Sequence, residues 1–440
     1  MTKKASQSKN QNLPESSFNE LNDMLSKISP DGAIIEDSIY AKIDEWISTG
    51  SYIFNAALSG SLFGGMPNRR SLMLAGEEST GKTYLSLSIV RNAQKMGYFA
   101  IYYDSEGAID IDFVRRLGVD TSKFRIENIG TVEEFTTLAA KLNETIANIR
   151  SSGKVPPKII VVLDSLGALS SLKEKNDSLI GSDKRDMTKQ QAIRKTFRVI
   201  GNDFAKNGIP FIICNHVYSA ISSYIPGNVV SGGGGGKYSA SIIMMLSKSK
   251  MTDKDSEDHV KKTGIEATKI GIVVTINPIK QRFARPIKVQ IHIPFYKKPN
   301  PYVGLEKFVS WETCGIVRGK MLSEKEYSKL PESEKKTCYE FESENKEKVY
   351  ALPKETARTL VCKHLKGEVP LSELYTDKVF TEDVLKQLDE NIIKKVFMLP
   401  SIESLEDLNE ISGELLDNAK LSDSDVIDGE NEISVDDINI

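Results

Sequence analysis

The sequence has little of the cysteine and histidine that zinc sites and disulfide frameworks require. Its 440 residues include four histidines and four widely spaced cysteines, Cys214, Cys314, Cys338 and Cys362. No Cys-x-x-Cys pair or mixed Cys/His cluster occurs. We therefore expect neither a zinc site nor a disulfide scaffold, and a reducing cytosol is the expected setting.

Long hydrophobic runs are missing as well. No stretch of 18 apolar residues occurs, although hydrophobic residues make up 40% of the chain. A membrane-spanning helix needs about 20 such residues, so none is expected, while a sizeable core is. Met1 to Lys4 is followed by polar residues, which argues against a secretory signal.

The charge is unevenly distributed. Residues 401–440 hold 13 acidic residues and one lysine, so residues 1–400 carry 57 basic and 48 acidic residues, a net charge of +9. A basic body fits a polyanionic partner, and an acidic tail can compete with that partner. A tail that only improves solubility is the alternative.

Short apolar runs alternate with helical patterns after residue 50. Strands are expected at 71–75, 98–103, 158–163, 210–214, 241–247, 270–276 and 287–293, and helices at 82–96, 131–149 and 190–206. Runs of branched residues between helices are typical of a parallel sheet covered on both faces. We therefore predict an α/β fold.

The flanking regions differ from this core. An amphipathic helix is expected from the spacing of Phe18, Leu21, Met24, Leu25 and Ile28. It would pack on its own core or on a neighbouring subunit. Residues 1–16 and 418–440 are polar and expected to be disordered. Helices are expected near 355–365 and 381–397, within a small C-terminal lobe. We therefore divide the chain into an N-terminal tail with the amphipathic helix (1–47), the α/β core (48–310), the C-terminal lobe (311–417) and a disordered acidic tail (418–440).

The segment from Gly76 to Thr83 matches the P-loop pattern in full and lies between an expected strand and an expected helix. Backbone amides of such a loop surround phosphate groups. Lys82 would reach the β- and γ-phosphates of ATP, and Thr83 would bind Mg²⁺. The predicted nucleotide-binding residues are Gly76, Glu77, Glu78, Ser79, Thr80, Gly81, Lys82 and Thr83.

Polar residues follow three of the expected strands. Asp164 ends a run of branched residues, as in a Walker B motif, and can hold the water shell of Mg²⁺. Glu106 can deprotonate a water molecule, although an ordinary loop glutamate is the simpler interpretation on the residues alone. Asn215 and His216 can sense a γ-phosphate, although a lone histidine is more often structural.

Several segments are compatible with DNA. Residues 217–236 combine apolar side chains with five glycines, which suits contacts to bases and phosphates, or a flexible linker. Residues 173–186 are expected to form a second loop. Arg194 and Arg198 share a helix face that can bind phosphate or remain solvated. A further basic group, Lys280, Arg282, Arg285 and Lys288, fits an anionic partner.

The order of these motifs resembles the RecA family of strand-exchange recombinases, with the closer likeness to its bacteriophage branch, typified by UvsX. The likeness covers residues 45–310 and is loose beyond them. It rests on Ser48 to Ser51, Asn55 to Gly60, the P-loop, Tyr103 to Asp110 with Phe113 and Arg115 to Asp120, Asn215-His216, and Lys280 to Arg282 with Pro286.

The resemblance implies roles at a shared ATP site. Glu106 would be the catalytic base, and Asp110 and Phe113 would face the adenine. Lys280 and Arg282 would reach the ATP of the adjacent subunit, acting in trans. Two further implied roles are adenine capping by Tyr302 across the interface and coupling of the γ-phosphate to residues 217–236 by His216.

The resemblance also implies DNA contacts. Arg194 matches a phosphate-contacting position, and Gly232 and Gly233 match backbone-contacting positions. The other candidates are Arg198, Tyr218, Ile221, Tyr224 and Ile225.

The implied protein has a RecA-like P-loop NTPase core, a short N-terminal helical segment for polymerisation and a small C-terminal lobe. It would be a DNA-dependent ATPase, using ATP and Mg²⁺, that forms a helical filament on single-stranded DNA and exchanges strands with double-stranded DNA. Implied partners are a single-stranded-DNA-binding protein and a loading mediator, in the cytosol of a bacterium, including a phage-infected one. The alternatives are a RecA-fold helicase-type motor and a regulatory ATP-binding switch without strand exchange.

Overall fold

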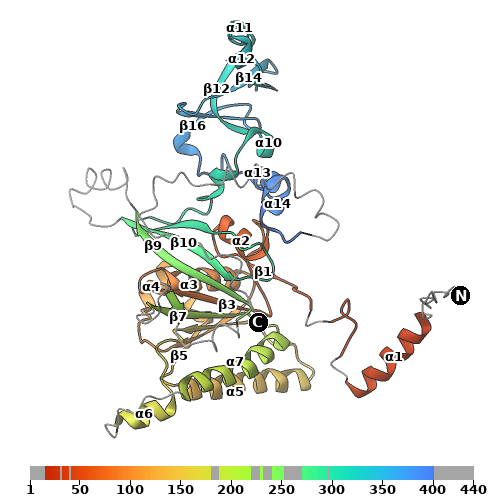
Figure 1. Ribbon diagram of the computed structural model, residues 1–440, viewed down its shortest axis with the longest axis vertical. Coiled ribbons are helices and arrows are strands. Elements are labelled where there is room, and N and C mark those ends of the chain that lie inside the picture. The colour runs from red at the N-terminus through yellow and green to blue at the C-terminus, as the bar shows by residue number, and fades with distance from the viewer. Residues whose placement is uncertain are drawn as a thin grey trace, which may run out of the picture.

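A large sheet forms the centre of the protein (Figure 1). The computed structural model describes residues 15–29, 32–38, 41–179, 188–219, 228–230, 240–251, 270–295 and 297–400. Within these residues the strand order is β11-β10-β9-β3-β7-β6-β4-β5, and β8 pairs with β7. The strands are β3 (Ser71–Gly76), β4 (Phe99–Asp104), β5 (Phe124–Asn128), β6 (Ile159–Asp164), β7 (Phe211–Ser219), β8 (Asn228–Val230), β9 (Ile242–Lys250), β10 (Gly271–Lys280) and β11 (Val289–Pro294).

The sheet is mostly parallel. All neighbours from β9 to β5 pair in parallel, whereas β10 and β11 extend the sheet antiparallel beside β9. The predicted α/β fold is therefore confirmed. The strand expected at 210–214 continues to Ser219 and pairs with β8, so the loop expected at 217–236 is wrong for residues 217–219 and 228–230. The other residues of that segment lie outside the described ones.

Helices cover both faces of the sheet because successive side chains of each strand point to opposite sides. Leu72 and Leu74 of β3 belong to one core, which includes residues of α2 and α3, and Met73 belongs to the other, which includes residues of α5 and α7. Each fully buried aliphatic side chain contributes roughly 1.5–3 kcal/mol to stability. The helices are α2 (Tyr52–Ser59), α3 (Lys82–Lys95), α5 (Val132–Ser151) and α7 (Thr188–Asn207).

Short elements connect these layers, and one of them corrects a prediction. The loop expected at 173–186 is helical in its first half, as α6 (Leu172–Leu179), because Ser171 caps the helix and accepts a hydrogen bond from the backbone of Glu174. Residues 180–186 lie outside the described residues. The other connecting elements are β1 (Trp46–Ile47), β2 (Met66–Pro67), α4 (Ile111–Arg116), η1 (Thr121–Lys123) and η2 (Leu305–Phe308).

The C-terminal lobe contains an antiparallel sheet with the order β13-β14-β12-β15-β16. Its elements are α10 (Trp311–Cys314), β12 (Ile316–Ser323), α11 (Glu324–Ser328), α12 (Glu332–Lys335), β13 (Tyr339–Glu342), β14 (Lys348–Pro353), β15 (Thr359–Cys362), β16 (Gly367–Pro370), η3 (Leu371–Glu373), α13 (Glu382–Leu388), the π-helix η4 (Asp389–Ile393) and α14 (Lys394–Phe397). The helices expected at 381–397 are present. The helix expected near 355–365 is wrong, because Leu360 and Cys362 are buried residues of β15, which pairs with β12 and β16.

A buried carboxylate attaches this lobe to the segment that follows α2. Asp389 is 3% exposed and accepts hydrogen bonds from the Ser61 hydroxyl and the Leu62 backbone amide, both at 2.7 Å. Tyr302 lies nearby between the stacked rings of Tyr52 and Phe380. The lobe is therefore held to the body by both polar and aromatic contacts.

The amphipathic helix expected near the N-terminus is α1 (Glu15–Ile28), which stands away from the sheet in Figure 1. Phe18, Met24 and Ile28 are 59%, 62% and 80% exposed, so its apolar face is not packed on this chain's own core. The disorder expected for residues 1–16 is wrong for Glu15 and Ser16, which form the start of α1. Residues 1–14 and 418–440, for which disorder is also expected, lie outside the described residues. Among the described helices, none has the length and apolar character needed to span a membrane.

Candidate nucleotide and nucleic-acid site

The P-loop connects β3 to α3 at the carboxyl edge of the parallel strands. Gly81 adopts a φ of 88°, and a Cβ atom there would lie 2.7 Å from Ile293 Cδ1, so only glycine fits. The Lys82 ammonium donates hydrogen bonds to the carbonyl oxygens of Gly76 (2.9 Å) and Glu77 (2.7 Å). Burial lowers the pKa of Lys82, and the carboxylates of the site oppose that shift.

Asp164, at the end of β6, receives two hydroxyl hydrogen bonds at one oxygen. Thr83 Oγ1 donates to Asp164 Oδ2 at 2.7 Å, and the buried Tyr102 hydroxyl donates to the same oxygen at 2.5 Å. Thr83 and Asp164 thus present oxygen atoms side by side, which is the ligand type that Mg²⁺ prefers. These residues fit a magnesium ion at this position.

Glu106 forms the centre of a second polar group. It accepts a hydrogen bond from Ser165 Oγ, and its Oε1 atom lies 2.7 Å from His216 Nε2. Burial raises the pKa of Glu106, but the hydrogen bonds from Ser165 and His216 outweigh this effect, and the net pKa is lowered. Glu106 is therefore ionised near neutral pH, as a general base must be.

The buried side chain of Asp104 fixes the loop that carries Glu106. Its carboxylate accepts hydrogen bonds from the backbone amides of Glu106 (3.0 Å), Gly107 (2.8 Å) and Ile109 (3.4 Å). Because β4 pairs in parallel with β6, Asp104 lies opposite Asp164. The register thereby brings Glu106 to the same sheet edge as the Walker B carboxylate.

These residues line one cavity of about 1910 Å³. The sequence-predicted residues among its lining are Glu77, Glu78, Ser79, Gly81, Lys82, Thr83, Glu106, Phe113, Asp164 and His216. Gly76 and Thr80 are buried beneath the loop, where the Thr80 hydroxyl donates to the Glu77 carbonyl at 2.8 Å. Asp110 instead caps α4 and accepts from the Phe113 amide, so it orients the segment that bears the ring.

Lys280 and Arg282 do not line this cavity. Arg282 lines a different cavity together with Ser71 and Ser241, which stand at the amino ends of β3 and β9. The P-loop follows the carboxyl end of β3, about 16 Å away at roughly 3.3 Å per residue. Burial lowers the pKa of Lys280, and Arg282 adds to that effect.

The structure gives Tyr302 a packing role. Its ring is 8% exposed between Tyr52 and Phe380, and its hydroxyl donates to Asp377 at 2.6 Å. Adenine capping by Tyr302 across a subunit interface stays a prediction.

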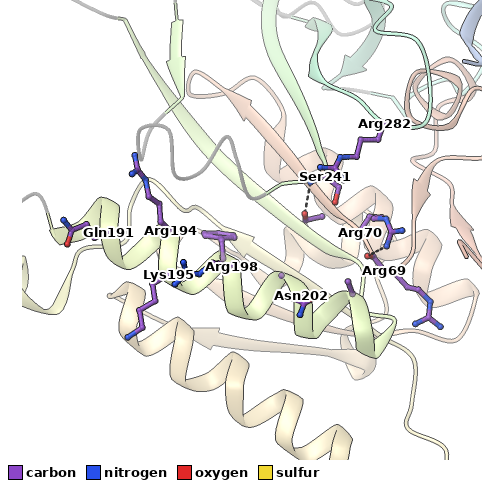
Figure 2. Close-up of a pocket in the computed structure, with 13 residues that line it drawn as sticks. Arg69, Arg70, Gln191, Arg194, Lys195, Arg198, Asn202, Ser241 and Arg282 are labelled. Atoms are coloured by element: carbon purple, nitrogen blue, oxygen red, sulfur yellow. Dashed lines mark hydrogen bonds between the residues drawn. The ribbon is translucent and has the colours of Figure 1, made fainter. Parts of the chain in front are cut away.

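Arg194 and Arg198 are exposed on α7 and line the same cavity as Arg282 (Figure 2). The backbone of Tyr218 belongs to β7, but its side chain is not described. The other predicted DNA contacts, Ile221, Tyr224, Ile225, Gly232 and Gly233, lie outside the described residues.

Sequence reasoning missed four residues of these sites. Asp104 and Ser165 stand next to motif positions and were visible as polar residues at strand ends. Tyr102 belongs to no sequence motif, and only the register between β4 and β6 brings its hydroxyl group to Asp164. Arg70 could not be identified from the sequence either, because Arg69 and Arg70 precede β3 and lie far in sequence from Arg194, Arg198 and Arg282, with which they share a cavity.

Comparison with known proteins agrees with this geometry. The family model described as the RecA N-terminal domain matches residues 21–297. The chain is 28% identical over 278 residues to the "Recombination and repair protein" of Enterobacteria phage T4, covering 60% of this chain and 68% of that protein. It is 30% identical over 267 residues to "Protein RecA" of Treponema denticola, covering 59% and 58%.

A third relative, "Protein RecA" of Thermus thermophilus, is 30% identical over 288 residues, covering 62% of this chain and 76% of that protein. The match therefore spans between 58% and 76% of the length of these relatives. The resemblance expected from the motifs is confirmed. The chain belongs to the RecA family of DNA-dependent ATPases, which act in recombination and repair, and it is similar to the family's phage T4 member.

Proposed function

We propose that this protein is an ATP-dependent recombinase that forms a helical filament on single-stranded DNA and exchanges its strand with a homologous duplex. The proposal rests on the family, on the nucleotide cavity and on the basic face of α7. A head-to-tail assembly of identical subunits that does not close into a ring yields such a filament.

One observation carries the proposal that the ATP site is shared. Arg282 stands at the amino edge of the sheet, whereas Lys82 and Glu106 stand at the carboxyl edge. A long side chain cannot span that distance within one subunit, but in a head-to-tail assembly the amino edge of one subunit meets the carboxyl edge of the next. Lys280 and Arg282 would then complete the neighbour's site in trans.

Within this site the chain's residues divide the work of hydrolysis. Lys82 would bind the β- and γ-phosphates, while Thr83 and Asp164 would hold Mg²⁺, which neutralises phosphate charge when bound. Glu106 would orient the attacking water and accept its proton, and Phe113 would pack against the adenine. Lys280 and Arg282 would stabilise the charge that develops on the transferred phosphoryl group.

Two contacts support coupling between the nucleotide and the DNA. His216 touches Glu106 and lies on β7, which includes residues 217–219 and so continues into the segment 217–236. Lys189 of α7 donates to the carbonyl oxygen of Gly167, which lines the nucleotide cavity. A change at the γ-phosphate would therefore reach both the loop and the basic helix.

The remaining partners are also part of this proposal. The exposed apolar face of α1 would pack on the neighbouring subunit and so polymerise the filament. A single-stranded-DNA-binding protein and a loading mediator are proposed from the resemblance alone. The proposed setting is the cytosol of a bacterial cell, including one infected by a phage.

Electron microscopy with single-stranded DNA and a slowly hydrolysed ATP analogue tests this proposal. Extended helical filaments, together with ATP turnover that rises when single-stranded DNA is added, are expected. Closed rings would instead support the helicase-type motor. Nucleotide binding with neither filaments nor stimulated turnover would support the regulatory switch.

A further inference from the structure

The hydroxyl group of Tyr102 donates a hydrogen bond to the same oxygen of Asp164 that Thr83 contacts. Tyr102 Oη lies 2.5 Å from Asp164 Oδ2, and Thr83 Oγ1 lies 2.7 Å from that atom. Asp164 is 8% exposed, so its carboxylate needs donors from within the protein. A hydrogen bond from a phenol to a carboxylate is charge-assisted and therefore strong. The carboxylate is thus held by donors from two different elements, β4 and α3.

The strand register brings the tyrosine to this position. β4 and β6 are parallel neighbours, in which Tyr102 pairs with Val162 and Asp104 pairs with Asp164. Residues two apart on a strand share one face of the sheet, so Tyr102 and Asp164 lie on the same face in diagonal positions. Diagonal neighbours in a sheet are roughly 7–8 Å apart, which is within the reach of an aromatic side chain. The hydroxyl at the tip of the ring can therefore meet the carboxylate.

The ring of Tyr102 is fixed by its surroundings. It is fully buried in the core that also contains residues of α3, and its centroid lies 5.4 Å from that of the Phe124 ring. A phenylalanine would fill the same space and make the same apolar contacts. Since burying a hydroxyl group without a partner is unfavourable, packing gives no reason for a tyrosine here. The hydrogen bond to Asp164 does.

The two donors differ in their access to the nucleotide. Thr83 lines the nucleotide cavity, whereas Tyr102 is not among the described residues that line it. The hydrogen bond from Thr83 can therefore change when nucleotide and metal enter or leave, while the one from Tyr102 can persist. The terminal torsion of an aspartate is broad, so a carboxylate with a single donor can rotate. A second, buried donor removes that freedom.

We propose that Tyr102 is a positioning residue, which holds the carboxylate of Asp164 in the orientation that a divalent cation requires. The inference rests on the proposed roles of Thr83 and Asp164, and it adds a residue that touches neither the nucleotide nor the metal. Because the carboxylate is already ordered, binding of the cation does not have to order it. Groups that orient metal ligands typically contribute about 10- to 100-fold to metal affinity.

The test compares Tyr102→Phe with the matched control Tyr103→Phe. Tyr103 is the next residue of β4 and is also buried, but it belongs to the core on the opposite face of the sheet. Binding of Mn²⁺ is measured by electron paramagnetic resonance on each full-length protein in complex with one equivalent of ADP. Tyr102→Phe is expected to weaken Mn²⁺ binding about tenfold, since Asp164 loses its buried donor. Tyr103→Phe should bind Mn²⁺ as the wild type does.

A second readout distinguishes positioning of the carboxylate from damage to the fold. Binding of a fluorescent ADP analogue in excess chelator depends on the P-loop and not on the metal. Its affinity should therefore be the same in Tyr102→Phe as in the wild type. A loss of this affinity as large as the loss of Mn²⁺ affinity would assign Tyr102 a structural role and overturn the inference.

Replacement of Tyr102 by 4-aminophenylalanine keeps a hydrogen-bond donor at the tip of the ring. This variant should bind Mn²⁺ nearly as well as the wild type, and weakening equal to that of Tyr102→Phe would contradict the inference. Unchanged Mn²⁺ affinity in Tyr102→Phe would overturn the inference and leave the proposed function standing. Failure of the wild-type complex with ADP to bind Mn²⁺ would instead refute the proposed roles of Thr83 and Asp164.

Discussion

Replacing Glu106 by glutamine separates catalysis from binding at the nucleotide site. Glutamine keeps the size of the side chain and a carbonyl oxygen that can accept from Ser165. It cannot accept a proton from water at neutral pH. The loop itself should stay in place, because the buried carboxylate of Asp104 holds its backbone amides.

The size of the effect follows from the role of a general base. Such a group contributes about 10²- to 10⁴-fold to the rate, which corresponds to about 2.7–5.4 kcal/mol of activation free energy. The Glu106→Gln variant should lose that factor in DNA-stimulated turnover. The P-loop contacts of Lys82 and Thr83 do not involve Glu106, so ATP affinity should change less than about threefold.

The assay pairs steady-state phosphate release with nucleotide and single-stranded DNA binding by the same protein preparation. Glu144→Gln, at an exposed position of α5, serves as the matched control and should behave like the wild type. Loss of turnover together with loss of ATP-dependent DNA binding would assign Glu106 a structural role. Turnover within a few-fold of the wild type would refute its role as the base.

Three further predictions concern the proton acceptor Glu106, the shared ATP site and the acidic tail. Ser165→Ala removes a hydrogen bond that lowers the pKa of Glu106, so that pKa should rise. The acid limb of the profile of ATP turnover against pH should then move to higher pH, and an unchanged limb would contradict this prediction. The variants Glu106→Gln and Lys280→Ala are each expected to be inactive alone. Mixing them should restore part of the ATP turnover, because some subunit interfaces then join an intact Glu106 to an intact Lys280. No recovery at any mixing ratio would refute the trans assignment. Deleting residues 401–440 should strengthen duplex-DNA binding mainly at low salt, because 13 acidic residues are removed; unchanged affinity would leave the tail a solubility device.

The sequence predicted the layers of the core because their signals are local. The P-loop has a fixed spacing, and the short apolar runs at β3, β6 and β7 between helical patterns favour a parallel sheet. The C-terminal lobe was harder, since the helix expected near 355–365 is the strand β15, whose partners β12 and β16 define it. Short apolar runs do not distinguish a strand from a helix without such partners.

The residues of the candidate site were also only partly predictable from the sequence. Lys82, Thr83 and Asp164 carry motif signals, and the structure brings their side chains together. Tyr102 and Arg70 could not be found in this way, because strand register and the approach of distant turns bring them to their partners. Predicting them would have required the three-dimensional fold.

An assay of homologous pairing shows directly whether this protein is a strand-exchange recombinase. Single-stranded DNA coated by the protein is mixed with a homologous duplex and ATP, and joint molecules are counted on a gel beside a heterologous duplex and a protein-free control. A strand-exchange recombinase is expected to form joint molecules that require ATP, homology and an intact P-loop lysine, Lys82. Joint molecules no more frequent than in the protein-free control, while ATP is still hydrolysed, would contradict it.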